Sequence, residues 1–241
     1  MPTGRYFLRN HAFFCLNESF CFILDVKADQ YFCIDILEFR LIAPHLHGWS
    51  NDRFMKVDNV LEGTPEAALA SDLVSRGILS ADAIDCKPAR PVTLPQATNT
   101  LKRVRHRSGL ARRSSLGTAF LKAAVRTTWR LKRSTLESTI ASVVQRKTAA
   151  CGSGNIPFDV ESAGELVAFF DTLRLAFPRN YVCLFDSLAL VDFLSQYRLF
   201  PTWVFGVCPE PFEAHCWVQA GDTLLNDTVE QTSAFIPIMT V

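Results

Sequence analysis

The sequence contains no uninterrupted run of roughly eighteen apolar residues, so we expect no transmembrane helix. Its opening residues, MPTGRYFLRNHAFF, lack the basic and apolar segments of a secretory signal peptide. The eight cysteines include no C-x-x-C pair, whereas zinc ligands are usually closely spaced. No G-x-x-x-x-G-K-[ST] nucleotide loop occurs either. We therefore predict a cytoplasmic protein with reduced, mostly buried cysteines, no metal and no cofactor.

Acidic residues are almost missing from one part of the chain. Residues 101–150 hold 13 of the 25 lysines and arginines and a single acid, Glu137. Apolar residues recur there at mostly helical spacing, at Leu116, Phe120, Ala124, Leu131 and Ile140. This basic helical segment, residues 101–148, either binds a polyanion or a partner, or is the solvated face of helices that support the next domain. The second interpretation is favoured, and a nucleic-acid partner is not expected, because no nucleic-acid motif or aromatic platform accompanies the charge.

The N-terminal residues 1–85 predict an α+β module. Three strand-like stretches, HAFFCL, FCFILDV and QYFCID, are separated by the turns NES and KAD, which favours an antiparallel meander. Helical patterns follow in ILEFRLIAPHL, broken at Pro44, and in PEAALASDLVSRGIL, which Pro65 opens and Gly77 closes. Leu69, Leu73 and Val74 are expected on one face of the second helix. We interpret the whole as a winged-helix-like module, followed by a proline-containing linker over 86–99.

The remaining residues, 100–241, predict a second α+β domain with its catalytic core at 155–241. Ser162 and Glu165 have the spacing of a capping box, which predicts a helix that ends before Pro178. A second helix is expected to begin at Cys183 and to bury one stripe of side chains. Short strands then follow in TWVFGVC, CWVQA, DTLLND and AFIPIM. The predicted stripe consists of Leu184, Leu188, Val191 and Leu194.

Three residues in this domain could form a nucleophilic site. A thiol reacts as the thiolate, which a helix N-terminus and a neighbouring imidazole both stabilise. Cys183 has the first, and His215 supplies the second if its strand lies beside the helix start. Strand alternation puts His215 and Trp217 on one face and Cys216 on the other. Asp227 could hold the imidazole in the required tautomer. By spacing alone, inert core packing remains the stronger interpretation.

The motifs add to this interpretation. The sequence reads C-L-x-x-S-L-A-L from Cys183, W-V-F-G-V at 203–207, P-F-x-A-H-x-W-V at 211–218 and N-D at 226–227. This set, over about sixty residues, resembles the bacterial transglutaminase-like family represented by the lasso-peptide B protein, a leader peptidase. The resemblance implies a papain-like triad, with Cys183 as nucleophile, His215 as general base and then acid, and Asp227 as the residue that orients the imidazole.

Two residues depart from that family pattern. Asp186 stands where relatives often carry a basic residue, and a carboxylate there suits the helix dipole but opposes a nearby thiolate. It is expected to face solvent or to contact substrate. Cys216 stands where alanine is usual, and its side chain is expected to face away from the site and to serve packing.

The N-terminal module also carries a resemblance. CFILDVKADQYFCID, the helices after it and LVSRGIL resemble the peptide-recognition element fused to such peptidases, which is similar to a pyrroloquinoline-quinone biosynthesis chaperone. The resemblance implies that a leader peptide adds as a strand to the sheet edge beside a helix. The alternative is that these residues form only the module's own core. The implied groove residues are Tyr31, Phe32, Cys33, Ile34, Leu69, Leu73 and Arg76.

Taken together, the sequence predicts a cysteine endopeptidase that removes the leader of a ribosomally made precursor peptide in lasso-peptide biosynthesis. The freed amine would pass to a partner cyclase resembling asparagine synthetase, which the resemblance alone implies. Two alternatives belong to other classes: an acyltransferase of related fold, in which an amine replaces water, and a leader-binding protein without catalysis.

Overall fold

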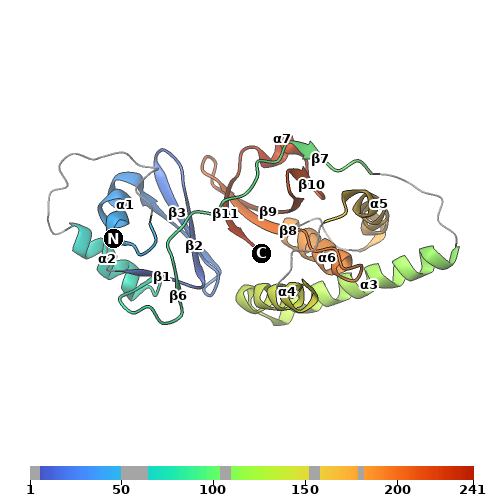
Figure 1. Ribbon diagram of the computed structural model, residues 1–241, viewed down its shortest axis with the longest axis horizontal. Helices are drawn as coiled ribbons and strands as arrows, with labels where there is room; N and C mark the ends of the chain where they lie inside the picture. Colours follow the sequence, from blue (N-terminus) through green and yellow to red (C-terminus); the bar gives the residue numbers. More distant parts are fainter. Residues whose placement is uncertain (1–5, 50–64, 104–109, 152–157, 179–181) are drawn as a thin grey trace. The chain divides into compact units, whose positions relative to one another are not determined.

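The computed structural model describes residues 6–49, 65–103, 110–151, 158–178 and 182–241 (Figure 1). The chain divides into two compact units, Met1–Thr93 and Leu94–Val241. The division falls inside the predicted linker, 86–99, although both ends of that segment pair with sheets. Among the residues described, no helix is long and apolar enough to cross a bilayer.

The first unit contains the three-stranded meander that the sequence predicts. β3 pairs antiparallel with both neighbours, giving the order β2-β3-β4. The first turn forms because the Asn17 side chain accepts the N–H groups of Ser19 and Phe20. Asp25 does the same for Lys27 and Ala28 in the second turn. The strands are β2 (Ala12–Leu16), β3 (Phe20–Asp25) and β4 (Gln30–Asp35).

A second small sheet and two helices complete this unit. The sheet has the order β5-β1-β6. The second helix ends as predicted, because Gly77 adopts a φ of +73° and the N–H of Ile78 bonds back to Leu73. One expectation is wrong: Val74 is exposed, since it lies one position beyond the buried Leu73. The elements are β1 (Phe7–Arg9), α1 (Ile36–Ile42), the 3₁₀ turn η1 (Ala43–His45), α2 (Pro65–Ser75), β5 (Leu79–Ser80) and β6 (Cys86–Lys87).

The second unit is a five-stranded sheet covered by helices. The strand order is β11-β8-β9-β10-β7, in which only the β10–β7 pair is parallel. Its strands are β7 (Asn99–Thr100), β8 (Thr202–Cys208), β9 (Glu213–Ala220), β10 (Thr223–Leu224) and β11 (Ile236–Thr240). Its helices are α3 (Leu110–Arg133), α4 (Leu136–Cys151), α5 (Val160–Ala176), α6 (Cys183–Ser195) and α7 (Val229–Thr232).

Helix α6 lies at the centre of this unit. It packs against the sheet through β9 and β8, and α3 and α5 pack on its other sides (Figure 1). Its residues 187–194 are all buried, so the predicted single stripe is too narrow. A helix that is apolar all round is surrounded by protein, and α6 fits that rule. The nucleophile candidate therefore begins the most enclosed helix of the domain.

The start of α5 differs from the prediction. Asp159 caps the helix by accepting the N–H groups of Glu161 and Ser162, so the helix begins three residues before the predicted capping box. Ser162 lies inside the first turn, and its hydroxyl bonds to the Asp159 carboxylate. Aspartate caps a helix as well as serine does, and here Asp159, the earlier residue in the chain, is the cap.

Candidate active site

Cys183 is the first residue of α6, as the sequence predicts. The preceding residue, Val182, is extended and supplies no side-chain cap. The first N–H groups of any helix lack an intrahelical acceptor, Val182 does not cap them here, and the helix dipole makes this end partly positive. The side chain of Cys183 is half-buried at this end.

His215 is held in place by partners of its own. It lies on β9, the central strand of the five, opposite Gly206 of β8, and its Nε2 is 2.5 Å from the Asp227 carboxylate. Asp227 is fixed in turn, because its other oxygen accepts the N–H of Thr228 at 2.8 Å. The rings of His215 and Trp217 stack 6.0 Å apart, which agrees with the predicted shared face. The structure thus joins two of the three predicted triad residues directly.

Cys183, the third residue, is connected to this pair by hydrogen bonding that sets the pKa of its thiol. Hydrogen bonds from Cys216 and His215 outweigh burial and lower the pKa of Cys183 to about 4. The bonds to Asp227 and Cys183 raise the pKa of His215 to about 9. Between these two values the stable form is a thiolate beside an imidazolium. The sulfur is therefore an anion at neutral pH, which is its nucleophilic form.

Cys216 contradicts the expectation that its side chain faces away from the site. Alternation does turn it from the face of His215, but α6 packs on that other face and brings Cys183 to it. Its side chain is buried and hydrogen-bonds to Cys183, which, together with burial, raises the pKa of Cys216 well above its usual value. Cys216 therefore stays a neutral thiol, able to donate to the Cys183 thiolate.

Asp186 is partly exposed, and its carboxylate is paired within the domain. Its carboxylate accepts the N–H of Val182 at 3.1 Å and forms an ion pair with the buried Arg174 of α5. The guanidinium of Arg174 also lies over the ring of Phe185. Burial raises the pKa of Asp186, while Arg174 opposes that rise. Arg174 thus balances the carboxylate that would otherwise oppose the thiolate of Cys183.

Two polar residues connect the three segments that carry the site. The Ser187 hydroxyl on α6 donates to the carbonyl of Cys216 on β9 at 2.9 Å, and the Asn226 amide donates to that hydroxyl at 3.1 Å. Asn226 also accepts the N–H of Val218 at 2.7 Å. These bonds fix α6, β9 and the segment before Asp227 to one another. Sequence reasoning missed this role, although both residues stand in the motifs C-L-x-x-S and N-D.

A small cavity lies next to the two aromatic rings that contact His215. It has a volume of about 250 Å³ and is lined mainly by Trp217, Phe235, Val229 and the segment 94–97. Phe235 and Trp217 are the two rings that contact His215, at 5.1 and 6.0 Å between centroids. The cavity is therefore separated from the imidazole by these two rings, and its mainly apolar lining suits an apolar group.

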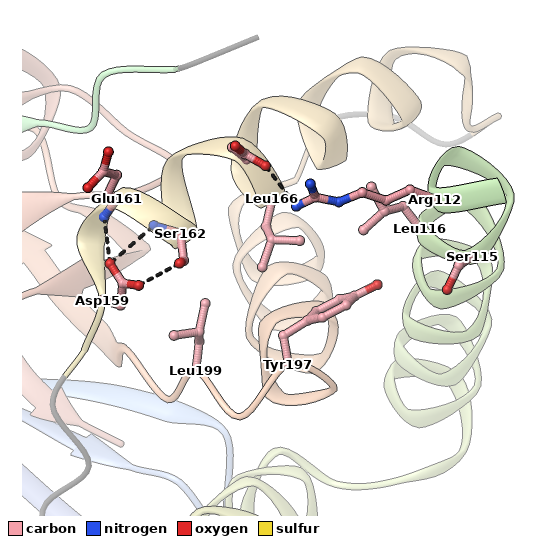
Figure 2. A pocket seen from close by; sticks show the side chains of 10 residues that line it. Arg112, Ser115, Leu116, Asp159, Glu161, Ser162, Leu166, Tyr197 and Leu199 are labelled. Carbon is pink, nitrogen blue, oxygen red and sulfur yellow. Dashed lines mark hydrogen bonds and ion pairs between the residues drawn. The ribbon is translucent and has the colours of Figure 1, made fainter. Parts of the chain in front are cut away.

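A larger cavity lies at the other end of α6. It has a volume of about 700 Å³, and Figure 2 shows Arg112 of α3 facing α5, where it pairs with Glu165 at 2.8 Å. Tyr197, just beyond the end of α6, lines the same cavity. A helix of thirteen residues is about 20 Å long, so this cavity is remote from Cys183.

The predicted leader-binding residues lie on two elements of the first unit. Tyr31, Phe32, Cys33 and Ile34 are on β4, which lies at one end of its sheet. The guanidinium of Arg76, just beyond α2, lies 5.3 Å from the centre of the Phe32 ring, so the end of α2 is beside this strand.

Burial divides the predicted leader-binding residues. Ile34 and Leu73 are buried in the unit's own core, so their side chains are not free to bind a peptide. Cys33 is exposed, and Tyr31, Phe32 and Leu69 are half-buried.

Within the parts of the chain that the structure describes, no three His, Cys, Asp or Glu residues are grouped as metal ligands would be.

In a comparison with known families, residues 123–240 match the model of the transglutaminase-like superfamily. The C-terminal part of the chain is therefore a transglutaminase-like domain of mixed α+β structure, a class whose members are often cysteine-based enzymes. Neither a curated protein nor a solved structure matches the chain.

Proposed function

We propose that the protein is a cysteine peptidase that removes the leader from a ribosomally made precursor, as the lasso-peptide B proteins do. The observation that carries the proposal is the joining of Cys183, at the start of α6, to the His215–Asp227 pair. A thiolate at a helix N-terminus, beside an imidazolium oriented by a carboxylate, is the arrangement used for attack on carbonyl carbon. The transglutaminase-like domain supports this chemistry.

The proposed reaction has two steps. The Cys183 thiolate attacks the scissile carbonyl, and N–H groups at the start of α6 stabilise the oxyanion. Because Nε2 of His215 is bonded to Asp227, Nδ1 is the nitrogen available to protonate the leaving amine. The amide bond breaks, leaving the leader as a thioester on Cys183 and the core peptide with a free amine. Water, activated by the now neutral imidazole, then hydrolyses the thioester and restores the thiolate.

The first unit would hold the leader. β4 is an end strand, so its outer backbone N–H and C=O groups could pair with a peptide. Its exposed Cys33 and half-buried Tyr31 and Phe32 would border that peptide. A peptide added to such an edge gains main-chain hydrogen bonds, and α2 would border the groove near Arg76. We propose that the winged-helix-like module acts in this way, and that the released amine is passed to an asparagine-synthetase-like cyclase.

The test uses a candidate precursor peptide with its leader, and the products are read by mass spectrometry. Cys183→Ala is expected to abolish leader removal and to leave leader binding unchanged, since the binding unit is untouched. Cys208→Ala removes a cysteine of the same domain outside the site and is expected to cleave normally. Full processing by the Cys183→Ala protein would identify a binding protein without catalysis. Transfer of the leader to an added amine, without hydrolysis, would identify an acyltransferase.

A further inference from the structure

Helix α3 carries a row of apolar side chains on its outer surface. Leu121, Val125 and Trp129 are spaced four residues apart and are 54, 56 and 61% exposed. The opposite face of the same helix, including Phe120 and Ala124, is buried in the domain, where α3 packs on α6 (Figure 1). The outer row is therefore additional to the apolar face that the fold needs.

The row borders a hollow with a basic rim. The hollow has a volume of about 460 Å³ and is lined by the three apolar side chains together with Thr118, Lys122 and Arg126. Lys122 and Arg126 are themselves four residues apart and form a second row beside the first. No residue of α3 is acidic.

The two rim residues, Lys122 and Arg126, differ in their ion pairing from two arginines of the same helix. Arg112 pairs with Glu165, and Arg130 pairs with Asp192, so these charges are used within the domain. For Lys122 and Arg126, by contrast, no ion pair is found within the described ranges of the chain. Their charge is therefore available to an outside group.

We propose that this outer face of α3 is a docking surface for an amphipathic helix of a partner protein, with an apolar stripe bordered by Asp or Glu. Apolar side chains of that helix would lie along Leu121, Val125 and Trp129, and its acidic row would face Lys122 and Arg126. From Leu121 to Trp129 the helix rises by eight steps, or about 12 Å, which matches roughly two turns of a partner helix. A contact of this size suits a transient complex.

Three other possible occupants fit this surface less well, because each would leave either its charge or its apolar row unmatched. In a symmetric pairing with a second copy, the basic rims would face each other and repel. A nucleic acid would use the rim but leave the apolar row in water. A lipid surface would gain only three apolar side chains from this helix.

The test measures binding of the full chain to a labelled helical peptide of about 18 residues, with leucines at i, i+3, i+4 and i+7 and flanking glutamates. A matched peptide carries lysines in place of the glutamates. The acidic peptide is expected to bind about tenfold more tightly and to shift Trp129 emission to the blue, a shift absent from Trp129→Phe. Val125→Asp should weaken binding about tenfold by placing a charge in the apolar row.

Charge exchange makes the test specific. The Lys122→Glu, Arg126→Glu double variant is expected to prefer the lysine peptide, whereas Lys102→Glu, outside α3, should keep the preference for the acidic one. Equal binding of both peptides by the unaltered protein, or an unchanged preference in the double variant, would overturn the proposal. So would tighter binding of phosphatidylglycerol vesicles or single-stranded DNA through the same residues, or a dimer that Trp129→Ala dissociates in sedimentation.

Discussion

The two ends of helix α6 each carry an aspartate paired with arginine, yet the pairs have different consequences. Near the start, Asp186 binds Arg174 and the N–H of Val182, close to the Cys183 sulfur. Near the end, the fully buried Asp192 binds Arg130 of α3 and Arg146 of α4. The first pair adjusts the charge around the Cys183 thiol, whose pKa is lowered, and the second holds three helices together. The same chemical pair thus acts on reactivity or on stability according to what lies next to it.

The largest effect is expected from breaking the pair at the end of α6. Asp192→Ala leaves two arginines without their buried partner and should lower the free energy of unfolding by about 3–5 kcal/mol. Chemical denaturation measures this change. Asp72→Ala breaks an exposed ion pair with Arg76 and should cost less than about 1 kcal/mol. An equal loss of unfolding free energy in the two variants would show that burying the ion pair does not increase its effect on stability.

The next effect tests the thiolate at the start of α6. With a pKa of about 4, Cys183 is a thiolate at pH 6, so iodoacetamide should modify it rapidly there. The rate should decline only as the pH falls through about 4. His215→Ala removes the imidazolium and should slow modification at pH 6 by roughly 100-fold. Mass spectrometry of the labelled residue gives the rate, and a pH profile centred near 8.5 in the unaltered protein would refute the assignment.

A smaller change is expected from the neighbouring cysteine. Cys216→Ala removes the hydrogen bond that contributes most to the lowered pKa of Cys183, so its pKa should rise. Cys216→Ser retains a donor and should restore most of the reactivity at low pH. The alkylation profiles of the two variants distinguish a hydrogen bond from a packing effect, because packing alone predicts the same profile for both.

The smallest effect in this set concerns the pair that shields the thiolate. Arg174→Gln keeps a hydrogen-bond donor to Asp186 but removes the positive charge, leaving the carboxylate to oppose the thiolate. Modification of Cys183 at pH 5 should slow by roughly threefold to tenfold, with little change at pH 8. A uniform loss at every pH would instead indicate that the start of α6 had moved.

Local signals in the sequence predicted much of the fold. Asn17 and Gly77 mark a turn and a helix end by chemistry that acts within a few residues, and both predictions are confirmed. The start of α6 at Cys183 and the shared face of His215 and Trp217 follow from helix boundaries and strand alternation. These features depend on neighbouring residues alone.

The predictions that failed depend on packing between distant segments. Asp186 meets Arg174 only because α5 lies beside α6, and Cys216 meets Cys183 only because α6 covers its face of β9. No periodicity in the sequence states which face of a strand a helix will cover. The roles of Ser187 and Asn226 were hidden for the same reason, since their bond joins residues 39 positions apart.

Gly206 has a consequence for how the domain tolerates variation. A Cβ there would lie 2.8 Å from the indole of Trp217, the ring that stacks on His215. Backbone crowds the same spot, with the Ile236 carbonyl oxygen at 3.2 Å, so the indole would have to give way. In a saturation library selected for turnover, we expect only glycine to survive at position 206. Even alanine on β8 would displace the Trp217 indole, and the indole would then tilt the His215 ring on β9.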